Sequence, residues 1–185
     1  MKFFKSVNKK QLLTLLACAV IIFAIAATAL NGASFASVSA TRKKVPIYSV
    51  GREENDKIIS ISFDAAWGNE DTQQLIDILG KYNIKATFFL VGDWVDKYPE
   101  SVKALHDAGH EIMNHSDSHP HMSKLSKEQI LAELNSCNDK IEKITGIRPI
   151  LFRAPYGEYN DLLLDTAKSA GMYTIQWDVE TLYTE

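Results

Sequence analysis

Residues 57–91 read KIISISFDAAWGNEDTQQLIDILGKYNIKATFFLV and contain the unit that decides the fold. Residues 57–63 alternate in polarity and predict a strand with three side chains on its apolar face, Ile59, Ile61 and Phe63. Residues 71–82 have helical spacing and predict one face with four buried side chains, Leu75, Ile76, Leu79 and Tyr82. Residues 86–91 form a second β-rich run. This order of strand, helix and strand predicts an α/β fold.

The alternation continues through the rest of the chain. Further helices are predicted over residues 99–108, 126–144 and 161–170, and further strands over residues 110–113, 150–152 and 173–177. The clearest helix starts with a capping box and has an apolar stripe, formed by Ser126, Gln129, Ile130, Leu134, Cys137, Ile141 and Ile144. Repeated units of this kind predict a parallel sheet with covered faces. Because five strands cannot close an eight-stranded barrel, we expect a distorted, incomplete (β/α) barrel.

The composition is that of a globular domain with a real core. Of the 185 residues 46% are hydrophobic and 23% are charged, and the net charge is -3. No basic stripe is present, so we do not expect a nucleic acid partner. The two cysteines, Cys18 and Cys137, are not expected to form a disulfide, which does not argue against export from the cell.

The N-terminus contains a long apolar run behind four lysines, Lys2, Lys5, Lys9 and Lys10. The run is uncharged and close to the ~20 residues that span a bilayer. It favours a retained signal anchor over a cleaved signal peptide, although small residues near position 40 are suitable for cleavage. The predicted organisation has four parts, a cytoplasmic region at 1–10, a transmembrane helix at 11–30, a linker at 31–56 and the domain at 57–185. We expect the domain to face outward from the cell membrane, or to be secreted if cleavage occurs.

All five histidines lie between positions 106 and 121. His115 and His119 are four residues apart in the sequence HSDSH. On a helical turn this spacing places both imidazoles on one face, which suits a divalent metal. The pair alone is equally typical of surface or capping histidines.

Polar residues follow the predicted strands. Asp64 ends the first strand, and Arg153 follows the strand at 150–152 and precedes a proline-containing turn. The carboxyl ends of parallel strands line the ligand crevice in α/β folds, and an arginine there can bind a carboxylate through two nitrogens. Taken singly, each residue is more typical of a cap or a surface salt bridge. Trp67 lies near a loop and could stack on a sugar ring, but packing is the commoner role.

Taken in order, these motifs resemble the NodB-type polysaccharide deacetylases, the fourth family of carbohydrate esterases. Residues 62–65 (SFDA) stand where that family has Thr-Phe-Asp-Asp. Residues 115–119 match its His-Ser/Thr-x-x-His motif, and residues 153–157 match Arg-x-Pro-Tyr-Gly. The resemblance runs from about residue 58 to residue 177 and implies a barrel of the polysaccharide deacetylase type. Residues 63–68, with the N-terminal membrane segment, look most like the branch associated with sporulation.

The resemblance implies a hydrolase that removes N-acetyl groups from an amino-sugar polymer such as peptidoglycan or a chitin-like glycan. Asp64 would be the general base, and His115 and His119 would hold a divalent metal, with zinc expected. Arg153 would orient the base, and the backbone N–H of Tyr156 would stabilise the oxyanion.

The chain departs from the family pattern at three places. Ala65 replaces the second aspartate, which is the third metal ligand, and a methyl group cannot coordinate a metal. Asp117 is not expected to replace it, because a helical turn would direct it away from His115. Residues 179–184 lack the carboxylate that should pair with Arg153, and the fifth motif, which carries the acid histidine, has no counterpart up to Glu185. We therefore expect this chain as written to have little or no activity.

Two other functions remain open from the sequence. The chain could be an exported glycan-binding protein that kept the fold and lost the chemistry, as Ala65 suggests. It could also be a structural α/β domain whose histidines bind no metal.

Overall fold

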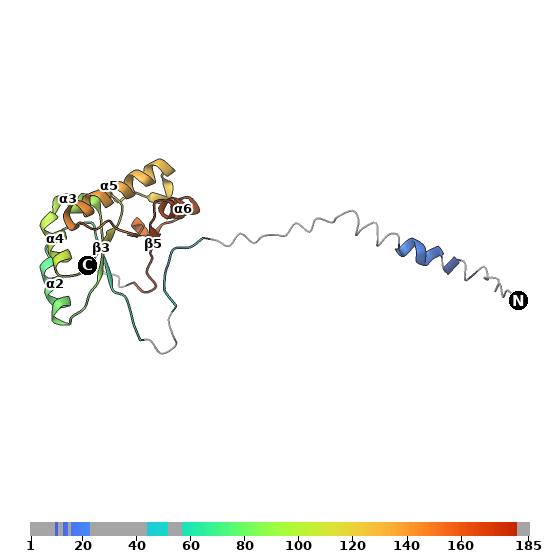
Figure 1. Ribbon diagram of the computed structural model, residues 1–185, viewed down its shortest axis with the longest axis horizontal. Helices are drawn as coiled ribbons and strands as arrows, with labels where there is room; N and C mark the ends of the chain where they lie inside the picture. The colour runs from blue at the N-terminus through green and yellow to red at the C-terminus, as the bar shows by residue number, and fades with distance from the viewer. Residues whose placement is uncertain (1–9, 11–12, 15, 23–43, 52–56, 181–185) are drawn as a thin grey trace. The chain divides into compact units, whose positions relative to one another are not determined.

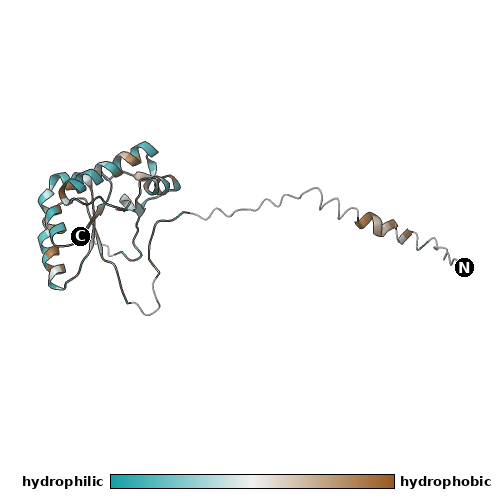
Figure 2. Cartoon of the chain, viewed as in Figure 1, coloured by the Kyte–Doolittle hydropathy of each residue, from teal (hydrophilic) through white to brown (hydrophobic). Residues whose placement is uncertain are grey.

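The computed structural model describes residues 10, 13–14, 16–22, 44–51 and 57–180. The chain forms two compact units, Met1–Arg42 and Lys43–Glu185. In the first unit residues 16–22 are helical and hydrophobic (Figure 2). Most of the predicted anchor at 11–30 lies outside the described residues. Among the helices that are described, none combines the length and the hydropathy required to traverse a bilayer.

The second unit is built on a five-stranded parallel sheet whose spatial order follows the sequence. Its strands are β1 (Ser62–Ala65), β2 (Thr87–Leu90), β3 (Glu111–Asn114), β4 (Leu151–Phe152) and β5 (Tyr173–Thr174). Asp64 is in register with Phe89, and Asn114 pairs with both Leu90 and Phe152. Because all strands run in one direction, the segments that follow them meet at one edge of the sheet.

The helices between the strands form an arc on the outside of the sheet (Figure 1). They are α2 (Thr72–Lys81), α3 (Gly92–Lys97), α4 (Pro99–Asp107), α5 (Lys127–Thr145) and α6 (Asp161–Ser169), with short 3₁₀ helices η1 (Met122–Lys124) and η2 (Pro155–Gly157). Their surfaces are mostly hydrophilic (Figure 2). This α/β arrangement with a parallel sheet is consistent with the incomplete barrel that the sequence predicts.

The residues at the two ends of α5 determine where this helix begins and ends. The Ser126 hydroxyl accepts a hydrogen bond from Gln129 N, and the Gln129 side chain accepts one from Ser126 N, which completes the predicted capping box. The helix ends at Gly146, whose φ of 72° is left-handed and therefore favours glycine. The predicted apolar stripe is fully buried at four positions, Ile130, Leu134, Cys137 and Ile141.

Three local expectations from the sequence differ from the structure. The first strand starts at Ser62 rather than at residue 57, and Ile59 is 83% exposed. Tyr82 lies just after the last turn of α2, so it is 63% exposed instead of buried. Helix α3 was not predicted, because six residues are too few to establish a helical period.

A further segment lies along the edge of β5. Ile47 N donates a hydrogen bond to Thr174 O at 2.9 Å, and Gln176 N donates one to Ile47 O at 2.8 Å. Ile47 forms a parallel bridge with Ile175. These contacts fall within the range 31–56 that the sequence suggests as a linker, so part of that range contributes to the sheet.

Candidate active site

Asp64 and Arg153 form the centre of the site. Arg153 Nη1 donates to Asp64 Oδ1 at 2.7 Å, and Nη2 donates to Ser62 Oγ at 2.8 Å. The Arg153 side chain is only 5% exposed, whereas Asp64 is 33% exposed. The guanidinium also stacks on the Phe89 ring, with its carbon 4.1 Å from the ring centroid. Strands β1, β2 and β4 thus fix one carboxylate oxygen and leave the other open to solvent and substrate.

His115 lies beside the second oxygen of this carboxylate. Its Nε2 is 3.8 Å from Asp64 Oδ2, and its Nδ1 is 2.8 Å from the carbonyl oxygen of Arg153. Burial lowers the pKa of His115, and the nearby Asp64 carboxylate opposes this only in part. The imidazole is therefore neutral at pH 7, with Nδ1 as the donor and a lone pair on Nε2 toward Asp64.

His119 is brought next to His115, with ring centroids 5.1 Å apart. Burial lowers the pKa of His119 as well, opposed by Asp64. The Nδ1 atom of His119 is buried and has no hydrogen-bond partner in the described part of the chain. The three residues that the sequence suggests for base and metal binding therefore lie together at one edge of the sheet.

The segment between the two histidines is not the helical turn that we expected. Ser116 and His119 have left-handed φ values of 68° and 57°, and no helix forms between them. The loop folds back so that Ser116 Oγ accepts a hydrogen bond from His119 N at 3.0 Å. Asp117 points toward α5, where it lies 2.7 Å from Lys140 Nζ and accepts a hydrogen bond from Ser136. It is thus excluded as a metal ligand by its partners and not by helical geometry.

Aromatic side chains surround His119. The rings of Tyr156 and Trp67 lie 4.7 Å and 5.9 Å from the His119 ring. Tyr156 also stacks on His121, whose Nδ1 is 3.1 Å from Glu158 Oε2. Trp67 is 79% exposed, which is unusual for a tryptophan that only packs. Tyr156 itself has a φ of 59°, so the predicted oxyanion residue sits in a left-handed turn in η2.

The residues fit a divalent metal only in part. Two neutral imidazoles are side by side, and one buried ring nitrogen lacks a partner, as a metal ligand would before binding. Within the described ranges, however, no three side chains of His, Cys, Asp or Glu are arranged to hold an ion. Ala65 contributes no donor and packs against the apolar core. His115 and His119 would therefore hold a metal as two protein ligands, with water completing its coordination.

Arg153 has one further unmatched atom. Its Nε is buried without a hydrogen-bond partner among the described residues. The sequence suggests that the carboxylate usually paired with this arginine is missing from residues 179–184. The Trp177 ring lies nearby, with its centroid 5.7 Å from the guanidinium carbon.

Several residues that support the site were not identified from the sequence. Asn114 is fully buried and binds both the loop and α5, through Ser116 N and through Asn138 Oδ1. Glu133 accepts hydrogen bonds from Asp117 and Ser118. Asn114 at the end of a strand gave some signal, but Glu133 is one of many polar residues on an amphipathic helix, and the partners of both are distant in sequence.

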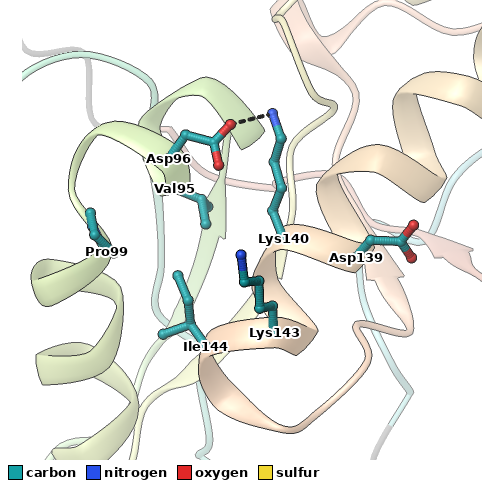
Figure 3. A pocket seen from close by; sticks show the side chains of 7 residues that line it. All are labelled: Val95, Asp96, Pro99, Asp139, Lys140, Lys143 and Ile144. Atoms are coloured by element: carbon teal, nitrogen blue, oxygen red, sulfur yellow. Dashed lines mark ion pairs between the residues drawn. The ribbon is translucent and has the colours of Figure 1, made fainter.

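A separate groove of about 410 Å³ lies between α3, α4 and α5 (Figure 3). Its lining contains seven residues, Val95, Asp96, Pro99, Asp139, Lys140, Lys143 and Ile144. None of the candidate catalytic or metal-binding residues lines it. The candidate residues therefore lie at the sheet edge and not in this groove.

Comparisons with known proteins identify the family of this domain. Residues 51–175 match the family model described as polysaccharide deacetylase. The peptidoglycan-N-acetylmuramic acid deacetylase PdaC of Bacillus subtilis is 40% identical over 143 residues, which are 75% of this chain and 30% of that protein. A mutant of BA3943, a CE4 family pseudoenzyme, is structurally similar with a TM-score of 0.68 and 38% identity, covering 72% of this chain and 48% of that chain. Another BA3943 mutant, described as having restored enzymatic activity, has a TM-score of 0.65 and 39% identity over 66% of this chain and 45% of that chain.

The chain spans less than half the length of the first curated relatives, 42% of YlxY and 30% of PdaC, both from Bacillus subtilis. The family match nevertheless covers most of this sequence, including all three motifs. This chain belongs to the polysaccharide deacetylase family.

Proposed function

We propose that this chain carries the base and the metal-binding residues of an N-deacetylase for an amino-sugar polymer, with peptidoglycan as the substrate. The observation that supports it most is the Asp64 carboxylate, held by Arg153 at 2.7 Å and next to His115 at 3.8 Å. Similarity to a peptidoglycan deacetylase, PdaC, supports the choice of polymer. The family resemblance also favours a role in sporulation. The uncharged apolar run behind four lysines supports an outward-facing domain held at the cell membrane by residues 11–30.

In this proposal the free oxygen of Asp64 takes the proton from the attacking water. Arg153 holds the other oxygen, so the carboxylate keeps one orientation through the reaction. The backbone N–H of Tyr156 donates to the oxyanion that develops on the acetyl carbonyl. A divalent metal bound by His115 and His119, with zinc expected, would polarise that carbonyl and acidify the water.

Acetate release tests the proposal directly. The chain is incubated with zinc and either N-acetylglucosamine oligomers or peptidoglycan, and free acetate is measured. The rate of the unchanged chain is expected to be low because Ala65 supplies no metal ligand, and Asp64→Asn should reduce it to the background because the base is lost. Asp77→Asn, an exposed change on α2, is the control and should not alter the rate. Activity that survives Asp64→Asn would rule out this assignment of the base.

A second candidate function is binding of the glycan without turnover. Ala65 in place of the third ligand favours it, as does similarity to the pseudoenzyme BA3943. Glycan binding measured by calorimetry, without acetate release and independent of zinc, would support this function over the first. The third ligand is one of the features that separate the two functions, and restoring it tests that feature directly.

Ala65→Asp should strengthen zinc binding by at least about tenfold, because it adds a carboxylate to two imidazoles. Ala65→Asn has nearly the same size without the charge and is the matched control, for which a smaller gain is expected. Calorimetric titration with zinc measures both variants. Equal zinc affinity in Ala65→Asp and the unchanged chain would show that position 65 does not reach the metal.

A further inference from the structure

The loop between His115 and His119 is held by side-chain oxygens at every backbone N–H from Ser116 to His119. Asn114 Oδ1 accepts from Ser116 N, and Ser116 Oγ accepts from His119 N. The two central N–H groups, of Asp117 and Ser118, both donate to Glu133 Oε2 at 2.8 Å and 2.9 Å. The Ser118 hydroxyl donates to Glu133 Oε1 at 2.8 Å. One carboxylate on α5 therefore binds the middle of this loop with three hydrogen bonds.

The loop requires this support because its backbone is unfavourable. Ser116 and His119 both adopt left-handed φ values, which cost a residue other than glycine roughly 1–2 kcal/mol each. A conformation of this kind persists when surrounding contacts over-determine it. Asn114 and Ser116 lie in the same short stretch as the histidines, whereas Glu133 lies on a separate rigid helix. Glu133 is thus one of the contacts that fix the loop relative to the rest of the domain, and it binds the two central N–H groups.

The loop-facing side of α5 extends beyond Glu133. Ser136 and Lys140, three and seven positions further on, face the same side and bind the Asp117 carboxylate. Lys140 Nζ also pairs with Asp96 of α3 at 2.8 Å, as Figure 3 shows. On the other side of the loop, Gly92 N and Asp93 N donate to the carbonyls of Ser116 and Asp117. The loop is therefore clamped between α3 and α5.

We propose that Glu133 is a positioning residue that presets the two histidines for the metal by holding the loop between them. The inference rests on the proposed function, since it assigns Glu133 to the same metal site. Glu133 acts through the loop and touches neither imidazole in any contact described above. Three charge-assisted hydrogen bonds to one carboxylate are the kind of support that sets metal affinity in proteins.

The test compares zinc affinity with stability in matched variants of this chain. Glu133→Ala should raise the zinc Kd by about 10–100-fold, because the loop loses three hydrogen bonds and no longer holds the two histidines in place. Glu133→Gln keeps an oxygen for the two N–H donors and should retain most of the affinity. Glu142→Ala is the control: it lies on the same helix and loses an ion pair with Arg148. A zinc Kd that is the same in Glu133→Ala and Glu142→Ala, with only the melting temperature lowered in the former, would overturn the proposal.

A second readout works without metal. Imidazole ¹H–¹⁵N spectra of the metal-free protein should show that His119 shifts in Glu133→Ala and does not shift in Glu142→Ala. If the unchanged chain binds no zinc, the metal part of the proposed function fails, and these spectra alone decide the role of Glu133. Unchanged imidazole resonances in Glu133→Ala would then overturn the positioning role, and shifted resonances would support it.

Discussion

At the scale of single residues, Arg153 does more than any other side chain to define the site. It binds Asp64 with one nitrogen and Ser62 with another, while its flat face covers Phe89. Only a planar guanidinium can make all three contacts at once. The sequence offered a surface salt bridge as the commoner role of this arginine, but the side chain is buried.

Arg153→Lys should therefore be costly although the charge is kept. A lysine can replace one of the two hydrogen bonds, but neither the second one nor the stacking on Phe89. We therefore expect a loss of about 1–3 kcal/mol in the free energy of unfolding. Urea unfolding of the metal-free protein measures it. Arg148→Lys, at an exposed ion pair, is the control and should change stability little. Equal effects of the two substitutions would contradict the structural role of Arg153.

The two site histidines predict how stability depends on pH. Burial lowers the pKa of both His115 and His119 in the folded protein. Between the folded and the unfolded pKa, these histidines are therefore neutral in the folded protein and protonated in the unfolded chain. Their contribution to the free energy of unfolding is fully present above the unfolded pKa of about 6.5. It is lost as the pH falls from there through their pKa values in the folded protein. Over this range the buried His115 lowers the free energy of unfolding by at most about 1.4 kcal/mol per pH unit, and the more exposed His119 lowers it by less because solvent screens its charge.

Urea unfolding between about pH 7.5 and about pH 5.5 tests this direction, since carboxylates contribute little there. The free energy of unfolding should decrease as the pH is lowered, and this decrease should be smaller in His115→Asn. A steeper or unchanged slope in that variant would show that His115 is not the group responsible.

At the scale of elements, the close approach of α3 to the histidine loop depends on Gly92. A Cβ atom at this position would lie 1.9 Å from Asp117 Oδ1 and 3.1 Å from Asp117 Cα. The backbone atom cannot move aside without displacing the loop. The first residue of α3 must therefore be glycine for steric reasons, although its φ is not left-handed.

Gly92→Ala should destabilise the domain by about 1–3 kcal/mol, because the added methyl overpacks this contact. Gly80→Ala in α2 is the matched substitution with open space around it, and it should stabilise by about 0.5–1 kcal/mol. Thermal unfolding of both variants gives the comparison. A neutral Gly92→Ala would mean that the loop shifts freely and is not clamped.

At the scale of the whole domain, the edge of β5 is covered by the chain before the predicted domain start. Residues 46–48 pair with this edge through two backbone hydrogen bonds of Ile47. An uncovered edge strand would present unpaired donors and acceptors. The domain therefore gains stability from a segment that the sequence alone suggests is a linker.

A chain beginning at residue 43 should be more stable than one beginning at residue 57 by about 1–3 kcal/mol, given two hydrogen bonds of about 0.5–1.5 kcal/mol each. Urea unfolding of both chains measures the difference. Lys44→Ala in the longer chain should have little effect, since its ion pair with Asp165 is exposed. Equal stability of the two chains would show that the pairing at Ile47 is not significant.

The sequence by itself determined the α/β class, most helices and strands, and the set formed by Asp64, His115, His119 and Arg153. The elements follow from local periodicity and capping signals, whereas the four site residues are predicted from the resemblance to the family motifs. Only the tertiary structure decided how the histidine loop is shaped, because its conformation depends on Glu133, Gly92 and Asn114. Such contacts join residues far apart in sequence, and no short-range pattern encodes the distance between them.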